Sequence, residues 1–202
     1  MRTELRVQVS DYDCVPTSFL NALAYLFERK EIPPVVLQRV YMLCLDCMFH
    51  TNEQGHGTSA LAIEFIANVL TEFRSTKFKQ FRVNAEYVGE EMLHLGPGNK
   101  LVTCLNSGGV GVLAVKHFGK DWHEILALSS SDRWLYAFDP HPKSPKSKFN
   151  KVGCFEFLKP EGPHAPNLRI HYDWLETLSD QQPFRLGLRS QRGGVLINRV
   201  KV

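Results

Sequence analysis

The sequence has little of what marks membrane, secreted or nucleic-acid-binding proteins. Its apolar stretches fall far short of the roughly 20 residues that a membrane-spanning helix needs. Residues 1–6 carry charges with no apolar run behind them, which is not the pattern of a signal peptide. The net charge of +3 is too small to indicate a nucleic-acid partner. We therefore expect a cytoplasmic protein that binds neither membrane nor nucleic acid.

The chain also lacks the cysteine pattern of a disulfide framework. An odd number of cysteines, in a chain of 202 residues without a secretion signal, favours reduced thiols. Cys44, Cys47 and His50, with His56 beyond, resemble a metal cluster only superficially. Their spacing is not typical of a zinc site, and their segment has the pattern of an apolar helix face. We expect core packing there, and neither a metal nor another cofactor.

The periodicity of apolar residues predicts helices first and strands second. Helical spacing recurs over residues 15–29, 36–49 and 60–73, with a shorter helix over 99–105. Alternating or continuous apolar runs predict strands at 7–10, 81–87, 110–115, 123–128, 133–138, 152–158, 168–172 and 195–200. Hairpin turns are expected at 129–132 and at Gly193-Gly194. This order favours an α+β fold with a mainly antiparallel sheet, in one domain over residues 1–202.

Cys14 lies where a thiol would be activated, at the expected start of the first helix. Asp13 precedes it as a candidate capping residue, and Pro16 suits the first helical turn. Backbone N–H groups at a helix N-terminus stabilise a thiolate, which lowers the pKa of a cysteine. Gln8 stands six positions before Cys14. Its side-chain amide could join the Cys14 N–H in an oxyanion hole.

His123 opens one predicted strand, and Asp139 follows the next strand, sixteen positions later. If the two strands form a hairpin, both residues lie side by side at the same end of it. His123 would then exchange a proton with the thiol, and Asp139 would orient the imidazole. Taken singly, each residue has an ordinary structural alternative, such as a core cysteine or an Asp-Pro turn. Together they are the parts of a thiol-dependent acyl-transfer enzyme.

These motifs resemble the bacteriocin-processing cysteine peptidases, the papain-like domains that remove double-glycine leader peptides. The resemblance is carried by the Gln-x5-Cys opening and the His-x15-Asp-Pro spacing, and it covers roughly residues 5–141. It implies a papain-like fold, with Cys14 as nucleophile, His123 as base, Asp139 as orienting residue and Gln8 in the oxyanion hole. It also implies a peptide or protein substrate with small residues near the scissile bond. Val15 stands where the family usually has glycine, and residues 142–202 have no counterpart in it.

Three functions stay open at the level of sequence. The first is hydrolysis of a peptide amide through a Cys14 thioester. The second is transfer of the same acyl group to an amine or thiol, as in an acyltransferase or transglutaminase. The third is a peptide-binding module with weak catalysis. Trp122 could wall the site beside His123, and a lysine-rich loop could rim the cleft and attract an acidic partner; its lysines are Lys143, Lys146, Lys148 and Lys151.

Overall fold

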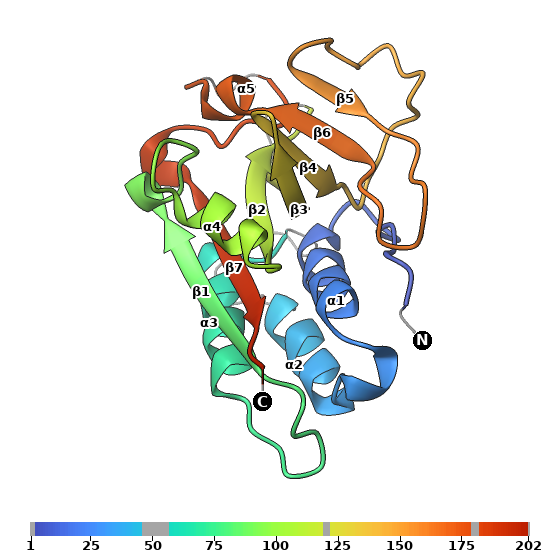
Figure 1. Ribbon diagram of the computed structural model, residues 1–202, viewed down its shortest axis with the longest axis vertical. Helices are drawn as coiled ribbons and strands as arrows, with labels where there is room; N and C mark the ends of the chain where they lie inside the picture. The colour runs from blue at the N-terminus through green and yellow to red at the C-terminus, as the bar shows by residue number, and fades with distance from the viewer. Residues whose placement is uncertain (1–2, 46–56, 119–121, 179–181, 202) are drawn as a thin grey trace, which may run out of the picture.

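The computed structural model describes residues 3–45, 57–118, 122–178 and 182–201 (Figure 1). Its centre is a seven-stranded antiparallel sheet with the strand order β1-β7-β2-β3-β4-β6-β5. The strands are β1 (Val83–Gly89), β2 (Val110–Lys116), β3 (Trp122–Ser131), β4 (Trp134–Phe138), β5 (Phe155–Phe157), β6 (Leu168–His171) and β7 (Gly193–Arg199). The expected α+β fold with a mainly antiparallel sheet is confirmed.

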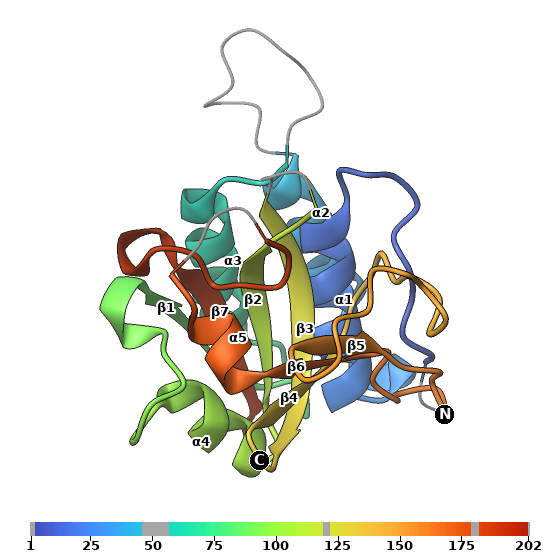
Figure 2. The same ribbon diagram turned by 90° about the horizontal axis from the view of Figure 1, so that it is seen from above.

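Helices lie on both sides of the sheet (Figure 2). On one side are α1 (Cys14–Leu26), α2 (Pro34–Cys44) and α3 (Ala60–Glu72), and on the other are the short α4 (Lys100–Asn106) and α5 (Tyr172–Glu176). Three 3-10 turns complete the elements: η1 (Arg29–Glu31), η2 (Glu90–Met92) and η3 (Arg189–Gln191). None of the helices within the described ranges is long and apolar enough to cross a membrane.

The alternation of side chains along β3 divides the buried apolar residues into two cores. Leu126 and Leu128 pack with the helices α1 to α3, whereas Ile125 and Ala127 belong to the core on the opposite side. Successive side chains of a strand point to opposite faces. By this alternation Glu124 shares the face of Leu126, toward α1, and His123 shares the face of Ile125.

The prediction of a strand at residues 7–10 was wrong. The backbone N–H of Gln8 donates to the Pro140 carbonyl at 2.8 Å, but residues 9–13 bend sharply instead of extending a ladder. Asp13 causes the bend, because its carboxylate accepts the backbone N–H groups of Val9 (3.0 Å) and Ser10 (2.7 Å). The Asp13 carboxylate therefore binds backbone groups that precede it in the chain, and it does not cap α1.

The predicted turn at Gly193-Gly194 was also wrong, because both glycines lie inside β7 and pair with β1. They are needed for close approach, not for turning. A Cβ on Gly193 would lie 2.7 Å from the Tyr87 hydroxyl oxygen, and one on Gly194 would lie 2.9 Å from a Leu113 methyl carbon. The chain places its last strand between β1 and β2 only because these positions carry no side chain.

The β3–β4 hairpin turns later than the sequence indicates. Strand β3 continues through Ser131, and the turn is the pair Asp132 and Arg133, with φ of 50° and 65°. Positive φ at both central residues is the backbone of a two-residue hairpin turn. The second helix is shorter than predicted and ends at Cys44. The remainder of that prediction, residues 46–49, lies outside the described residues.

Candidate functional site

Cys14 is the first residue of α1, and its buried thiol contacts the sheet. The thiol donates a hydrogen bond to Oε2 of Glu124 at 2.9 Å. One turn further along α1, the Ser18 hydroxyl donates to the Glu124 carbonyl at 3.0 Å. These two bonds fasten the first turn of α1 to β3 at one strand position.

The surroundings of the thiol oppose its ionisation. Burial raises the pKa of Cys14 well above its usual range, and the negative charge of Glu124 raises it further. Burial likewise raises the pKa of Glu124, although the hydrogen bond from the thiol acts in the opposite direction. The expectation of a lowered pKa was therefore wrong for this arrangement. Desolvation and a like charge outweigh the helix N-terminus, so the thiol is a neutral donor.

His123 and Asp139 lie side by side where β3 begins and β4 ends. The Nε2 atom of His123 is 2.7 Å from Oδ1 of Asp139, and both side chains are buried. The pairing of Leu126 with Phe138 brings these strand ends together. Since Nε2 faces the carboxylate, Nδ1 is the ring nitrogen that remains for a thiol.

The Cys14 thiol is bonded to the residue next to His123 and not to His123 itself. Within the described ranges no hydrogen bond joins the Cys14 thiol to His123, since the thiol is bonded to Glu124, the next residue along β3. The structure thus brings His123 to Asp139, and Cys14 to the residue that follows His123. Neighbouring residues of a strand point to opposite faces, so the His123 ring lies on the face of the sheet that is turned away from Cys14 and α1.

Gln8 lies in the loop that leads into α1. Its Nε2 donates to the Ser10 carbonyl at 2.6 Å, while its Oε1 is buried without a partner. Its backbone bond to Pro140 places the Gln8 backbone beside the residue that follows Asp139. An amide nitrogen carries two N–H donors, and Ser10 takes one of them. The hydrogen bonds of the described part of the chain do not connect Gln8 to Cys14.

Asn167 was not predicted as a site residue, yet it holds Asp139 in place. Its Oδ1 accepts the Asp139 backbone N–H at 2.6 Å, and its Nδ2 donates to the Asp139 carbonyl at 2.8 Å. Asn167 is buried and comes from the segment just before β6. A polar residue just before an apolar strand was its one signal in the sequence.

We expect Asn167→Ala to lower the free energy of unfolding by about 2–4 kcal/mol, because two buried backbone groups of Asp139 lose their partners. Urea unfolding at neutral pH measures this difference. The matched control is Asn150→Ala. Asn150 also bridges two backbone groups, since it accepts the Phe157 N–H and donates to the Pro145 carbonyl. It is partly exposed, and neither of these bonds involves Asp139. Equal losses for the two variants would contradict a special role for Asn167.

His117 is a second residue that was not predicted. Its ring centroid lies 4.8 Å from that of His123 and 5.8 Å from that of His141. Its Nε2 is buried without a partner. Burial lowers the pKa of His117 to about 4, and the neighbouring His123 adds to this effect. At neutral pH His117 is therefore an uncharged ring that lies tilted beside His123.

This pKa predicts a loss of stability in mild acid. The folded-state pKa of about 4 lies below the usual histidine value of 6.5, so the folded state binds fewer protons in this range. The stability that neutral His117 contributes is complete above pH 6.5 and is lost as the pH falls toward 4. We expect His117→Phe to remove about 1–2 kcal/mol of that decline, allowing for the partial exposure of the ring. Urea unfolding of both proteins between pH 7 and 4 checks this, and parallel curves would contradict it.

Glu124 also forms part of the lining of a pocket next to Cys14. The pocket has a volume of about 150 Å³ and lies between the start of α3 and strands β1, β7, β2 and β3. Trp122 is part of its lining, as is Gly193. Glu124 therefore connects the thiol with a cavity that has room for a side chain.

In the part of the chain that the structure describes, no three His, Cys, Asp or Glu side chains lie close enough together to hold a metal ion. The described cysteines Cys14, Cys44, Cys104 and Cys154 are free thiols. Cys47, His50 and His56 lie outside the described residues, so the structure does not test their predicted packing.

Comparison with known proteins adds no relative. No protein-family model matches this sequence, and no curated protein matches it. What the site does must therefore be argued from its own residues and geometry.

Proposed function

We propose that the protein is a cysteine peptidase with a papain-like arrangement, which hydrolyses a peptide amide through a Cys14 thioester. The observation that carries the proposal is the buried His123–Asp139 pair, set one strand position from the contact of the Cys14 thiol. A nucleophile at a helix start and a His–acid pair on an adjoining antiparallel sheet are the parts of this chemistry. The motifs that resemble the bacteriocin-processing peptidases supply the same residues, and free thiols suit a cytoplasmic enzyme.

Cys14 and His123 lie on opposite faces of the sheet, so the proposed reaction requires the start of β3 to turn His123 toward α1. The Cys14 thiol then leaves Glu124 and gives its proton to Nδ1 of His123. The sulfur attacks the substrate carbonyl carbon, and the resulting imidazolium protonates the leaving amine as the C–N bond breaks. Water, deprotonated by His123, then attacks the thioester, releases the carboxylic acid and restores the thiol. Asp139 keeps the imidazole oriented and stabilises its charged form through the bond to Nε2.

The negative oxygen of the tetrahedral intermediate needs two donors. The Cys14 N–H belongs to the first turn of α1, whose backbone donors have no intrahelical acceptors. The second N–H of the Gln8 amide is the other donor in this proposal, and the bond from Nε2 to Ser10 fixes the orientation of that amide. The loop that Asp13 closes holds Gln8 at the entrance to the helix.

The test is cleavage of a peptide library made from a bacterial proteome with a protease that cuts only after glutamate, which leaves lysine and arginine within the peptides. We expect new termini with the wild-type protein and none with Cys14→Ala, identified by mass spectrometry. Added glycine methyl ester reveals whether the acyl group passes to an amine instead of water. Identical peptide mixtures from the wild type and Cys14→Ala would overturn the proposed function.

A further inference from the structure

The pocket beside Cys14 has a mostly apolar lining that includes one acidic residue, Glu124. Its walls are formed by Ile63 of α3, Tyr87 of β1, Val112 of β2 and Trp122 of β3. Gly193 leaves space for the Tyr87 side chain in the pocket wall, since a Cβ at position 193 would lie 2.7 Å from the Tyr87 hydroxyl oxygen. Cavities of about 150 Å³ hold a molecule as large as benzene, which is the scale of one long side chain.

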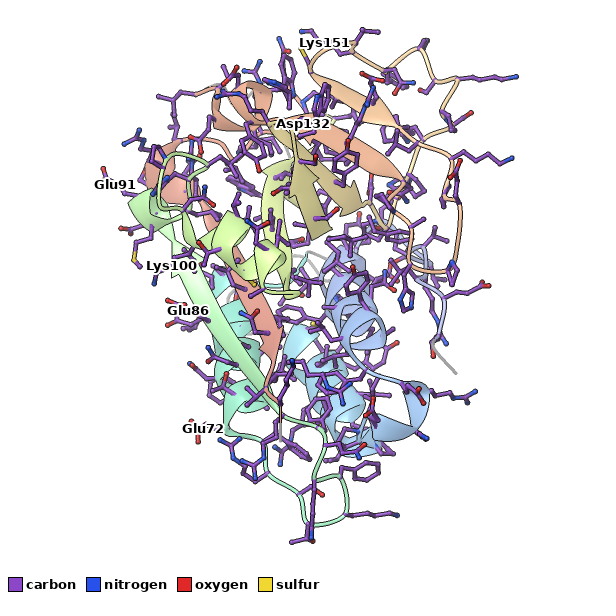
Figure 3. The ribbon with its side chains drawn as sticks, in the orientation of Figure 1. Glu72, Glu86, Glu91, Lys100, Asp132 and Lys151 are labelled. Atoms are coloured by element: carbon purple, nitrogen blue, oxygen red, sulfur yellow. The ribbon has the colours of Figure 1, made fainter. Side chains whose placement is uncertain are left out.

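Glu124 is a buried acid with no cationic partner in the described part of the chain, whereas several more exposed glutamates form ion pairs. Glu86 pairs with Lys100 at the surface (Figure 3), and Glu31 pairs with Arg199. Glu156 and Glu176 likewise pair with arginines. Over the described ranges, none of the ion pairs includes Glu124. The residue is nevertheless buried, with a relative exposure of only 7%. A buried carboxyl without a cation is costly, and a cation that enters the pocket would relieve that cost.

The surroundings of the pocket also favour a positive charge. The charges of Glu64 and Glu90 act on Tyr87, whose pKa is raised first by burial and then by these two acids. The ammonium group of Lys116 already lies over the Trp122 ring, with Nζ 3.9 Å from the ring centroid, so a further cation in the pocket would pair with Glu124. Aromatic walls attract cations over their faces, in particular where water is excluded. The pocket thus combines apolar walls for an alkyl stem with an acid for its cationic end.

We propose that this pocket is a subsite for a lysine or arginine side chain of the substrate, whose cation pairs with the Glu124 carboxylate. The proposal rests on the proposed peptidase function and names a class of substrate for it. Because Glu124 contacts the Cys14 thiol, the basic residue lies close to the scissile bond.

Direct binding tests the pocket without any turnover. We expect n-butylguanidinium to bind the wild-type protein in isothermal titration calorimetry, and its uncharged isostere N-butylurea to bind at least tenfold more weakly. Glu124→Gln should remove the preference for the cation, whereas Glu86→Gln, which changes an exposed acid of β1, should keep it. Equal binding of the two ligands to the wild type would overturn the proposal.

A second variant guards against misfolding of Glu124→Gln. Ala60 is exposed at the start of α3 and lines the pocket. Ala60→Trp should therefore fold normally and obstruct the pocket, which abolishes binding of n-butylguanidinium. Retained binding in this variant would place the cation elsewhere and would also overturn the proposal.

Peptide cleavage then separates the subsite from the proposed function. In the proteome-derived library, lysine or arginine should be enriched at least tenfold at one position near the cleaved bond, and Glu124→Gln should lose this enrichment. Cleavage without a basic preference would refute the subsite and leave the peptidase intact. Cation binding without any cleavage would refute the peptidase and leave the pocket as a cation site.

Discussion

Replacing His123 by alanine is expected to lower kcat/KM for peptide hydrolysis by about 10⁴-fold or more. In the proposed mechanism the imidazole carries the proton in both halves of the reaction, and no other described side chain is bonded to the Asp139 side chain. Asp139→Asn should lower kcat/KM by about 10²–10⁴-fold, because the amide no longer stabilises the charged imidazolium or fixes its tautomer. Steady-state kinetics with a peptide identified from the library measures both effects.

The control for these variants is His141→Ala. His141 stands two residues after Asp139 and reaches Oδ1 of that residue through its backbone N–H, which the alanine variant retains. Its side chain only stacks on His117. We expect kcat/KM to change little. A loss as large as that of His123→Ala, or full activity in Asp139→Asn, would contradict the assigned roles.

Replacing Glu124 by glutamine is expected to accelerate alkylation of Cys14 by iodoacetamide about tenfold or more at pH 7.5. The thiolate is the reactive form, and a fall of one unit in the pKa of the thiol raises the thiolate population about tenfold. The variant removes the negative charge that helps to raise the pKa of Cys14, while burial continues to raise it. The curve of rate against pH should therefore shift toward lower pH without reaching that of a free cysteine.

Cys44 is the internal standard for this experiment. Burial raises the pKa of Cys44 to about 12, and Glu124 makes only a small contribution. Mass spectrometry of tryptic peptides follows both cysteines in one sample. Acceleration at Cys44 equal to that at Cys14 would indicate loosening of the fold, and an unchanged rate at Cys14 would contradict the role of Glu124.

The sequence predicted the positions of the main helices and of His123 and Asp139 for simple physical reasons. The helical spacing of Phe19, Leu23 and Leu26 specifies a buried face, and Ser59 caps α3 by accepting the Ala62 N–H. Two apolar runs with a short polar segment between them form a hairpin, and the open end of this hairpin brings His123 and Asp139 together. These are local rules, and they hold within about twenty residues of chain.

The partners of Cys14 could not be predicted in this way. Glu124 is 110 positions from Cys14, and nothing local states which strand residue the first turn of α1 contacts. The sign of the pKa shift at Cys14 depends on that contact, since a helix start lowers the pKa and a buried carboxyl beside the thiol raises it. Asn167 and His117 were missed for a similar reason, because each acts through a residue that is distant in sequence or across a turn.

The place of β7 in the sheet has a consequence for how the protein is made. Residues 193–199 form the strand between β1 and β2, so β1 has no ladder to join until this last segment has been synthesised. Gly193 and Gly194 also line the pocket beside Glu124. Pairings between distant segments form slowly, and a growing chain exposes their edges in the meantime. A nascent chain can therefore carry Cys14, His123 and Asp139 and still lack a finished pocket, which forms only when residues 193–199 have been synthesised.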